Sequence, residues 1–242
     1  MLIDLASATN YSPKQNPKIK IIIVYEDNHL LLAVKPAGIP SQEDRSGRPD
    51  MLSILKRYLV EKYQKKGDAW LGLLHRLDQP TAGLMVFAKT SKAASRLSES
   101  FRKREVDKAY YAICRGKLSD PAGEWLDKIS SNKVNGRYQI DEKGKEASLS
   151  YEQIAWESEL NLSLMKFHLD SGRSHQIRVQ SSTRGIPLAG DRRYGRMDSF
   201  DQSLDSLALF SYELSFKHPV KDIKCQFTLP YPSDYPWSIF KR

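Results

Sequence analysis

The chain contains 242 residues, which is enough for one large domain or two small ones with a proper hydrophobic core, and because no internal repeat is visible we expect one domain. It carries 38 Lys and Arg against 29 Asp and Glu, and the resulting net charge of +9 suits a polyanionic partner such as nucleic acid. No apolar run approaches the roughly 18 residues that a membrane-spanning helix needs, so a membrane partner is not expected.

The cysteine content indicates a reducing compartment. Only Cys114 and Cys225 are present, far apart and without CxxC spacing, which argues against a disulfide framework and against a zinc site. The first 15 residues lack the basic segment and apolar core of a secretory signal. We therefore expect a cytoplasmic protein with two buried free thiols.

The N-terminal part is predicted to begin with a polar segment and to continue into a hairpin. Residues 1–18 are polar and contain two prolines, which predicts a flexible, poorly packed lead-in. Residues 19–25 and 30–35 are apolar runs separated by a turn, so both are predicted strands. The prolines and glycine of residues 35–40 (KPAGIP) predict an ordered loop.

Two helices follow from periodicity. Apolar residues recur at helical spacing over residues 51–63, with Pro49 and Asp50 well placed at the start. Thr90-Ser91 can cap a second helix that runs to about Arg104 and has one apolar and one basic face. A solvated surface helix explains this basic face as well as an RNA-binding helix does.

The second half of the chain is predicted to be mostly strand. The predicted strands are residues 108–114, 148–154, 162–169, 172–178, 207–216 and 223–229. Residues 117–146 are polar and rich in Gly and Lys, so loops or a loose hairpin are expected there. Many strands with few helices indicate an α+β domain on a largely antiparallel sheet.

The most informative segment is residues 72–89, GLLHRLDQPTAGLMVFAK. Pro80 cannot continue a sheet ladder and Gly83 permits unusual backbone angles, so the segment is predicted to form strand, loop and strand. Asp78 then lies on a loop between buried strands, where catalytic groups are commonly mounted. The residues alone leave open a structural turn with an ion pair between Arg76 and Asp78.

Five motifs, in family order, resemble those of RluA-type pseudouridine synthases. HRLDQPTAGL resembles HRLDxxTSGL, except that Ala82 replaces serine. KPAG resembles KPxG, and KAY, which ends at Tyr110, resembles KxY. GRSHQIRVQ resembles GRTHQIRVH, with Ser174 and Gln180 in place of Thr and His, and GIPLAGDRRYG resembles GxPLxGDxxYG. The resemblance runs from about residue 20 to about residue 229.

The resemblance implies a pseudouridine synthase catalytic domain over residues 19–242. Its α+β fold would have a bent, mixed, largely antiparallel central sheet flanked by a few helices. The implied reaction isomerises uridine in structured ribosomal or transfer RNA to pseudouridine: the base is cut from C1′ at N1, turned, and rejoined through C5. No redox change or external group takes part, so no metal or cofactor is expected. We expect a monomer that acts on RNA.

The same resemblance assigns catalysis to three residues. Asp78 would be the catalytic carboxylate, and Arg178 would be the guanidinium partner that keeps it ionised in a pocket. Tyr110 would provide an aromatic face for the base and a hydroxyl able to help remove the C5 proton.

The remaining assigned residues would bind RNA. The uridine must be flipped out of its stack, and Arg76 would fill the vacated space. Ile177 would pack against the pocket, while Arg173 and the arginines of residues 184–196 would contact phosphates. The other expected substrate contacts are His75, Thr81, His175 and Gln176.

Two other classes of function stay open. One is a catalytically silent RNA-binding module of the same fold, although phosphate binding would need none of Asp78, Tyr110 and Arg178. The other is a hydrolytic base-excising or glycoside-cleaving enzyme. Most glycosidases pair two carboxylates, and no second acidic residue accompanies Asp78 in its motif.

Overall fold

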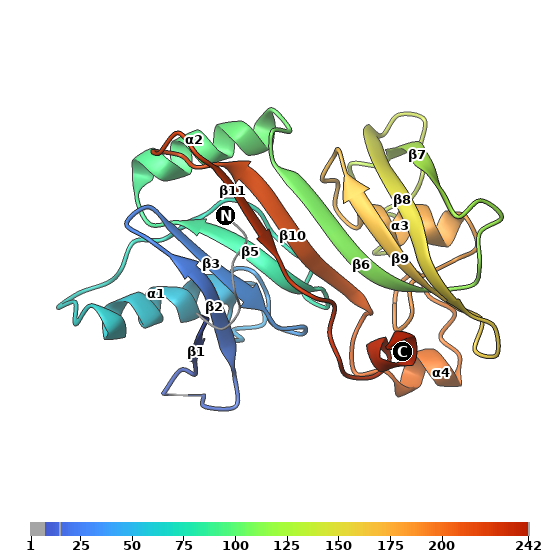
Figure 1. Cartoon of the computed structure of the whole chain (residues 1–242), viewed down its shortest axis with the longest axis horizontal. Coiled ribbons are helices and arrows are strands. Elements are labelled where there is room, and N and C mark those ends of the chain that lie inside the picture. Colours follow the sequence, from blue (N-terminus) through green and yellow to red (C-terminus); the bar gives the residue numbers. More distant parts are fainter. Residues whose placement is uncertain (1–7, 15, 242) are drawn as a thin grey trace. The chain divides into compact units, whose positions relative to one another are not determined.

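The computed structural model describes residues 8–14 and 16–241 (Figure 1). The chain divides into two compact units. Unit 1 consists of Met1–Val106 with Glu213–Leu229, and unit 2 consists of Asp107–Tyr212 with Pro230–Arg242. Strand β10 (Leu209–Lys217) begins in unit 2 and ends in unit 1.

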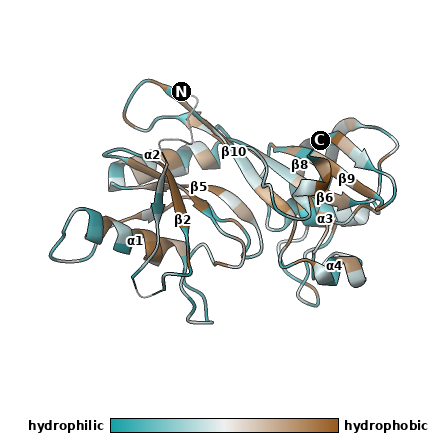
Figure 2. Ribbon diagram, turned by 60° about the horizontal axis from the view of Figure 1, so that its bottom comes forward, coloured by the Kyte–Doolittle hydropathy of each residue, from teal (hydrophilic) through white to brown (hydrophobic). Residues whose placement is uncertain are grey.

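Unit 1 is built on antiparallel strands with two helices. Its other elements are β1 (Thr9–Tyr11), β2 (Ile21–Glu26), β3 (Leu30–Lys35), α1 (Met51–Lys62), β4 (Gly72–Leu73), β5 (Ala82–Ala88), α2 (Ser91–Arg102) and β11 (Lys224–Thr228). The strand order is β1-β2-β3-β5-β10, with β4 also paired to β5 and β11 to β10. Residues 83–88 of β5 are all buried, which explains their continuous apolar run. Figure 2 shows apolar residues along β2 and β5, whereas the far end of α1 is hydrophilic.

The predicted elements of unit 1 are confirmed. β3 covers residues 30–35 as predicted, and α1 begins at Met51. The side chain of Asp50 caps α1 by accepting a hydrogen bond from the Ser53 amide, and Thr90 caps α2 by accepting one from the Ala93 amide. These caps satisfy amides that the first helical turn leaves without partners.

The lead-in differs from its prediction over the residues that the structure describes. Thr9–Tyr11 pair with β2, and the Tyr11 ring packs edge-on against Tyr58 of α1 with 5.1 Å between ring centroids. Part of the segment is therefore packed rather than loose, because a tyrosine supplies an apolar contact that composition alone did not reveal. Residues 1–7 and 15 lie outside the described residues.

Unit 2 is an antiparallel sheet covered by one buried helix. Its elements are β6 (Asp107–Arg115), β7 (Ala122–Ile129), β8 (Lys145–Glu157), β9 (Leu162–Leu169), α3 (Gln176–Thr183), α4 (Ser199–Ser203) and the 3-10 helix η2 (Trp237–Phe240). The strand order is β10-β6-β9-β8-β7. Ile177 of α3 joins a buried cluster that includes Trp125, Leu149 and Phe167, so α3 packs on the sheet through its apolar side.

Two predictions for unit 2 are wrong. The segment 172–178 is not a strand: α3 starts at Gln176, and residues 176–181 are all buried. The polar residues Gln176, Arg178 and Gln180 alternate with the apolar Ile177 and Val179, so the sequence has the period of a strand although it forms a helix. Residues 117–146 contain β7, which Trp125 and Ile129 anchor among otherwise exposed or half-buried residues. The short α4 was also not predicted.

None of the helices within the described ranges is long and apolar enough to cross a membrane.

The cap of α1 gives a direct test of the fold. Asp50 is 3% exposed, and its carboxylate accepts from the Ser53 amide over 3.1 Å. Asp50→Ala should lower the free energy of unfolding by about 1 kcal/mol in urea titrations because this amide loses its partner. Asp50→Asn keeps a side-chain acceptor and should lose much less. Equal losses in both variants would contradict the capping role.

Candidate active site

Asp78 begins a tight turn between β4 and β5. The Thr81 amide donates to the Asp78 carbonyl over 2.9 Å, which closes the turn through Gln79 and Pro80. Asp78 is half-buried, whereas Leu77 before it and Thr81 after it are 6% and 2% exposed. The prediction of a loop between two strands is therefore confirmed, and the main chain on both sides of the carboxylate is fixed in the interior.

The loop after β3 holds this turn by main-chain contacts. Ser41 Oγ donates to the Leu77 carbonyl over 2.8 Å and accepts from the Leu77 amide over 3.1 Å. The Gly38 amide donates to the Gln79 carbonyl over 2.9 Å, and Gln79 Nε2 donates to the Gly38 carbonyl over 3.0 Å. Gly38 has φ of 85°, a conformation that L side chains rarely adopt, so the glycine of KPAG is required there. Asp78 thus sits between two pinned residues.

Lys35 is the buried centre of the same contact. Its side chain is fully buried, and Nζ donates to the carbonyls of Pro36, Ile39 and Gln79 over 2.9, 2.7 and 3.0 Å. The three hydrogens of the ammonium group thereby match three main-chain acceptors. Burial lowers the pKa of Lys35 to about 7, and the negative charge of Asp78 opposes that shift. The Lys35 ammonium group therefore interacts electrostatically with the Asp78 carboxylate.

His75 and Arg76 precede the turn and differ in their surroundings. His75 Nε2 accepts from the Val86 amide over 3.1 Å, and its ring stacks on Phe101 with 5.0 Å between centroids. Because Nε2 accepts, the neutral ring carries its proton on Nδ1. Arg76 is exposed. The His75 ring thus helps to hold the strand pair, and the Arg76 side chain faces solvent.

Arg178 lies in unit 2, on the first turn of α3, and forms a buried ion pair with Asp191. Its Nε and Nη2 donate to the two carboxylate oxygens, each over 2.8 Å, and the residues are 4% and 1% exposed. Burial by itself would raise the pKa of Asp191, but hydrogen bonds from Arg178 and from the amides of Arg193 and Tyr194 hold that pKa below its usual range. The fork geometry fixes the plane of the guanidinium.

The N-terminus of α3 is held by its own loop. His175 is the N-cap in the left-handed conformation, with φ of 57°, and its Nδ1 lies 2.8 Å from the Tyr194 hydroxyl. Gln176 is buried: its Oε1 accepts from Ser171 Oγ and from the Arg173 amide, and its Nε2 donates to the Ser148 carbonyl. Gln176 therefore positions the helix start, and its expected contact with substrate stays a prediction.

Tyr110 and Ile177 meet in one apolar cluster of unit 2. Tyr110 is half-buried on β6 and packs against the cluster that contains Ile177 and Phe167. The predicted residues thus divide by unit: Asp78, His75, Arg76 and Thr81 belong to unit 1, and Tyr110, Arg173, His175, Gln176, Ile177 and Arg178 belong to unit 2.

Several arginines that are expected to contact phosphate also have partners within the protein. Arg184 pairs with Asp127 over 2.9 Å and lies 4.5 Å from the Trp125 ring. Arg196 Nη2 donates to the Arg115 carbonyl over 2.8 Å. Arg173 Nε donates to the Glu146 carbonyl over 2.8 Å, and Arg193 Nη1 donates to the Gly136 carbonyl over 3.1 Å. These side chains have structural partners, whatever further contacts they make.

Sequence reasoning missed the roles of Lys35, Ser41 and Asp191. Lys35 and Asp191 lie inside recognised motifs, so their positions were visible, but nothing in a motif shows that a charge will be buried. The signal for Asp191 was indirect, since a buried arginine needs a carboxylate. Ser41 carried no signal at all.

Comparison with known proteins identifies the class. A family model described as RNA pseudouridylate synthase matches residues 29–183. That match covers more than half of the chain, and the chain belongs to the RNA pseudouridine synthase family. The protein is therefore an isomerase that acts on RNA.

The relatives narrow this to the RluA type. The chain is 33% identical to the dual-specificity RNA pseudouridine synthase RluA of Vibrio vulnificus over 86% of this chain and 82% of that protein. It is 33% identical to the RNA pseudouridine synthase YhcT of Bacillus subtilis over 88% of this chain and 69% of that one. It is 34% identical to the ribosomal large subunit pseudouridine synthase D of Yersinia pestis over 90% of this chain and 69% of that protein.

A solved structure shares the fold. Human RNA pseudouridylate synthase domain containing 4 superposes with a TM-score of 0.71 at 24% identity, covering 87% of this chain and 88% of that chain. The predicted pseudouridine synthase fold of the α+β class is confirmed.

The buried ammonium of Lys35 predicts a pH-dependent stability. Its folded-state pKa of about 7 lies below its unfolded value, so above pH 7 the unfolded chain binds more protons and the parent gains stability as pH rises. Lys35→Met lacks this gain. The parent's free energy of unfolding minus that of the variant should increase by about 2 kcal/mol between pH 6 and pH 8.5 in urea titrations.

The matched control for this measurement is Lys65→Met, which removes an exposed ammonium group. Its difference from the parent should be the same at both pH values. A pH-independent difference for Lys35→Met would contradict the assignment of the titrating group.

The pair between Arg178 and Asp191 predicts a large cost for removing one partner. Asp191→Ala should lower the free energy of unfolding by about 3 kcal/mol because it leaves a buried guanidinium without its carboxylate. The double variant Arg178→Met with Asp191→Leu should regain most of that loss. If the double variant is less stable than Asp191→Ala, the single loss arises from packing rather than from the stranded charge.

Proposed function

We propose that the enzyme isomerises specific uridines of structured ribosomal or transfer RNA to pseudouridine with Asp78 as its catalytic carboxylate. The observation that carries the proposal is the construction around Asp78. The residues on either side of it are pinned by hydrogen bonds, whereas its own side chain is half-buried beside a cation. A catalytic group needs this combination of fixed main chain and ionised side chain.

The reaction makes limited demands on the protein. The bond between C1′ and N1 breaks, the base turns, a bond between C1′ and C5 forms, and the proton that C5 loses is balanced by one gained at N1. Asp78 serves as the single ionised carboxylate at the ribose and base. Its ionisation in a desolvated pocket is favoured by nearby cations. Lys35 supplies one such charge, and we propose Arg178 as the other.

Asp191 and the loop before α3 then act through Arg178. A guanidinium held by two hydrogen bonds to Asp191 has a fixed plane and direction, which a single flexible arginine would lack. We propose that Tyr110 stacks on the flipped base and that Arg76 fills the vacated stack. Ile177 lines the pocket, while Thr81, His75, His175, Gln176 and Arg173 position the RNA.

The names of two relatives bear on the RNA target. The relative from Yersinia pestis is named for the ribosomal large subunit, and the relative from Vibrio vulnificus is named as dual-specific. Both names are compatible with a ribosomal or transfer RNA target here. A cytoplasmic monomer stays the prediction for location and assembly.

The test is tritium release from RNA labelled at C5 of uridine. The parent should release tritium from ribosomal or transfer RNA fractions, and Asp78→Asn should release none while it binds the same RNA with similar affinity. The exchange replaces an ionised carboxylate by a neutral isostere, so binding and folding should survive while the chemistry stops.

The control variant is Asp68→Asn, an exposed aspartate of the same unit, which should retain the parent's rate. Release by Asp78→Asn would refute the role of the carboxylate. RNA binding by the parent without release from any fraction would favour a silent RNA-binding module, and free uracil in solution would indicate a base-excising enzyme.

A further inference from the structure

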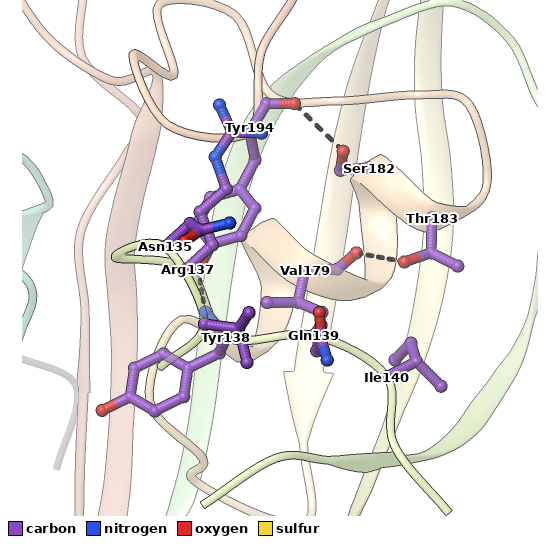
Figure 3. A pocket seen from close by; sticks show the side chains of 10 residues that line it. Asn135, Arg137, Tyr138, Gln139, Ile140, Val179, Ser182, Thr183 and Tyr194 are labelled. Carbon is purple, nitrogen blue, oxygen red and sulfur yellow. Dashed lines mark hydrogen bonds between the residues drawn. The ribbon is translucent and has the colours of Figure 1, made fainter. Parts of the chain in front are cut away.

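Unit 2 contains a pocket that none of the proposed catalytic residues lines. Its volume is about 460 Å³, within the size range of small-ligand sites. One wall is the outer side of α3, formed by Val179, Ser182 and Thr183 (Figure 3). Tyr194 closes one end, where its carbonyl accepts a hydrogen bond from Ser182 Oγ over 3.0 Å.

The opposite wall is the loop between β7 and β8, residues 130–144. Its tip is a two-residue turn in which Asn135 and Gly136 both have positive φ, and Val134 and Arg137 exchange two main-chain hydrogen bonds. Tyr138 ties this loop to the rest of the unit, because its amide donates to the Tyr194 hydroxyl over 2.9 Å. The pocket is therefore built by an ordered hairpin rather than by a loose loop.

The lining suits a neutral, polar, planar ligand that is attached to a negatively charged group. Asn135 and Gln139 contribute amide groups that can both donate and accept. Ser182 and Thr183 donate their hydroxyl hydrogens to main-chain carbonyls and so present acceptor oxygens. Tyr138 adds aromatic surface.

The charged side chain in the lining is positive. Arg137 lies in the lining, and no Asp or Glu is among the described residues that line the pocket. Lys133 Nζ lies 5.4 Å from the Tyr138 ring, and Arg193 donates to the Gly136 carbonyl at the hairpin tip. A ligand that joins a planar base to a phosphate backbone matches this arrangement.

Tyr194 connects the pocket with Arg178. Its ring centroid lies 5.1 Å from the Arg178 guanidinium, and its hydroxyl lies 2.8 Å from His175 Nδ1. A ligand that contacts Tyr194 would therefore also affect Arg178 and His175, which lie at the start of α3.

We propose that this pocket binds an unstacked nucleobase of the RNA, different from the uridine that is isomerised. The inference rests on the proposed function, because it makes the occupant part of the RNA substrate. Protein contacts with single-stranded bases commonly combine an aromatic surface, amide groups and nearby arginine, and all three are present here. Occupation of the pocket would contribute to selection among RNAs.

The test blocks the pocket from each wall. Gln139→Trp places a large ring inward from the hairpin, and Thr183→Trp does so from α3. The control is Asn132→Trp, which adds the same ring to an exposed position of the same hairpin outside the lining. Circular dichroism of all three should match the parent. On the RNA fraction that the parent isomerises, both blocking variants should raise KM about tenfold with kcat kept, and the control should change neither.

A second measurement does not depend on turnover. The parent is irradiated with total ribosomal and transfer RNA at short wavelength, and peptides that carry a nucleotide are sequenced by mass spectrometry. A nucleotide on residues 138–143 in the parent and in Asn132→Trp, but absent from Thr183→Trp, supports the pocket.

The outcomes separate the two proposals. Unchanged KM for both blocking variants, or bound RNA with no nucleotide on residues 138–143, overturns the pocket and leaves the proposed function standing if the parent isomerises RNA. RNA binding with a nucleotide on residues 138–143 but no isomerisation supports the pocket and refutes the function. Absence of RNA binding by the parent overturns both.

Discussion

The hydrogen bonds of the Lys35 ammonium group are the contact on which the Asp78 turn depends. One buried cation bridges two loops, since Nζ reaches the Ile39 carbonyl, four positions from Lys35 in sequence, and the Gln79 carbonyl, 44 positions away. A buried amine is costly unless every hydrogen finds an acceptor. Three main-chain carbonyls meet that requirement only if both loops keep their conformations. The cost of burial thus enforces the geometry of the turn, and Gly38 and Ser41 add neutral contacts on either side.

In unit 2 the buried charge of Arg178 is compensated by a carboxylate. Arg178 is also buried, but its planar fork is matched by both oxygens of Asp191 rather than by carbonyls of separate residues. Such a pair adds little net stability, because desolvation offsets attraction. Its value is directional: it holds a guanidinium in one plane at the start of a helix whose N-terminal residue, His175, adopts a left-handed conformation. In both units a desolvated charge is used to fix geometry rather than to stabilise the fold.

The sequence predicted the parts of the fold in which local pattern and burial agree. β3 and α1 were placed to within a residue because an apolar run ends at a turn and because Asp50 marks a helix start. α3 was misread as a strand because polar and apolar residues alternate over residues 176–180, and burial of the polar residues in ion pairs and hydrogen bonds cannot be read from that pattern. For the site, the motif located Asp78 and Arg178, but the partners Lys35 and Asp191 could not be assigned roles. Hydrogen bonds between residues far apart in sequence leave no local pattern.

This sequence departs from the family motifs at Gln180, Ser174 and Ala82, and the contacts of Gln180 show why its replacement can be accommodated. Gln180 stands where the motif has histidine; it is fully buried, and its Nε2 donates to Asp127 over 2.7 Å and to the Ala147 carbonyl over 3.2 Å. A histidine donor can serve the same carboxylate, so the position requires an N–H group rather than a titrating ring. Ser174 is exposed, and Ala82 lies at the half-buried start of β5. Gln180 keeps an N–H donor for Asp127, whereas Asp78 and Arg178 have no neutral side chain that could supply their charges. The residues that differ from the family motifs therefore belong to the scaffold. The residues that agree with the motifs include those whose charge the proposed chemistry needs.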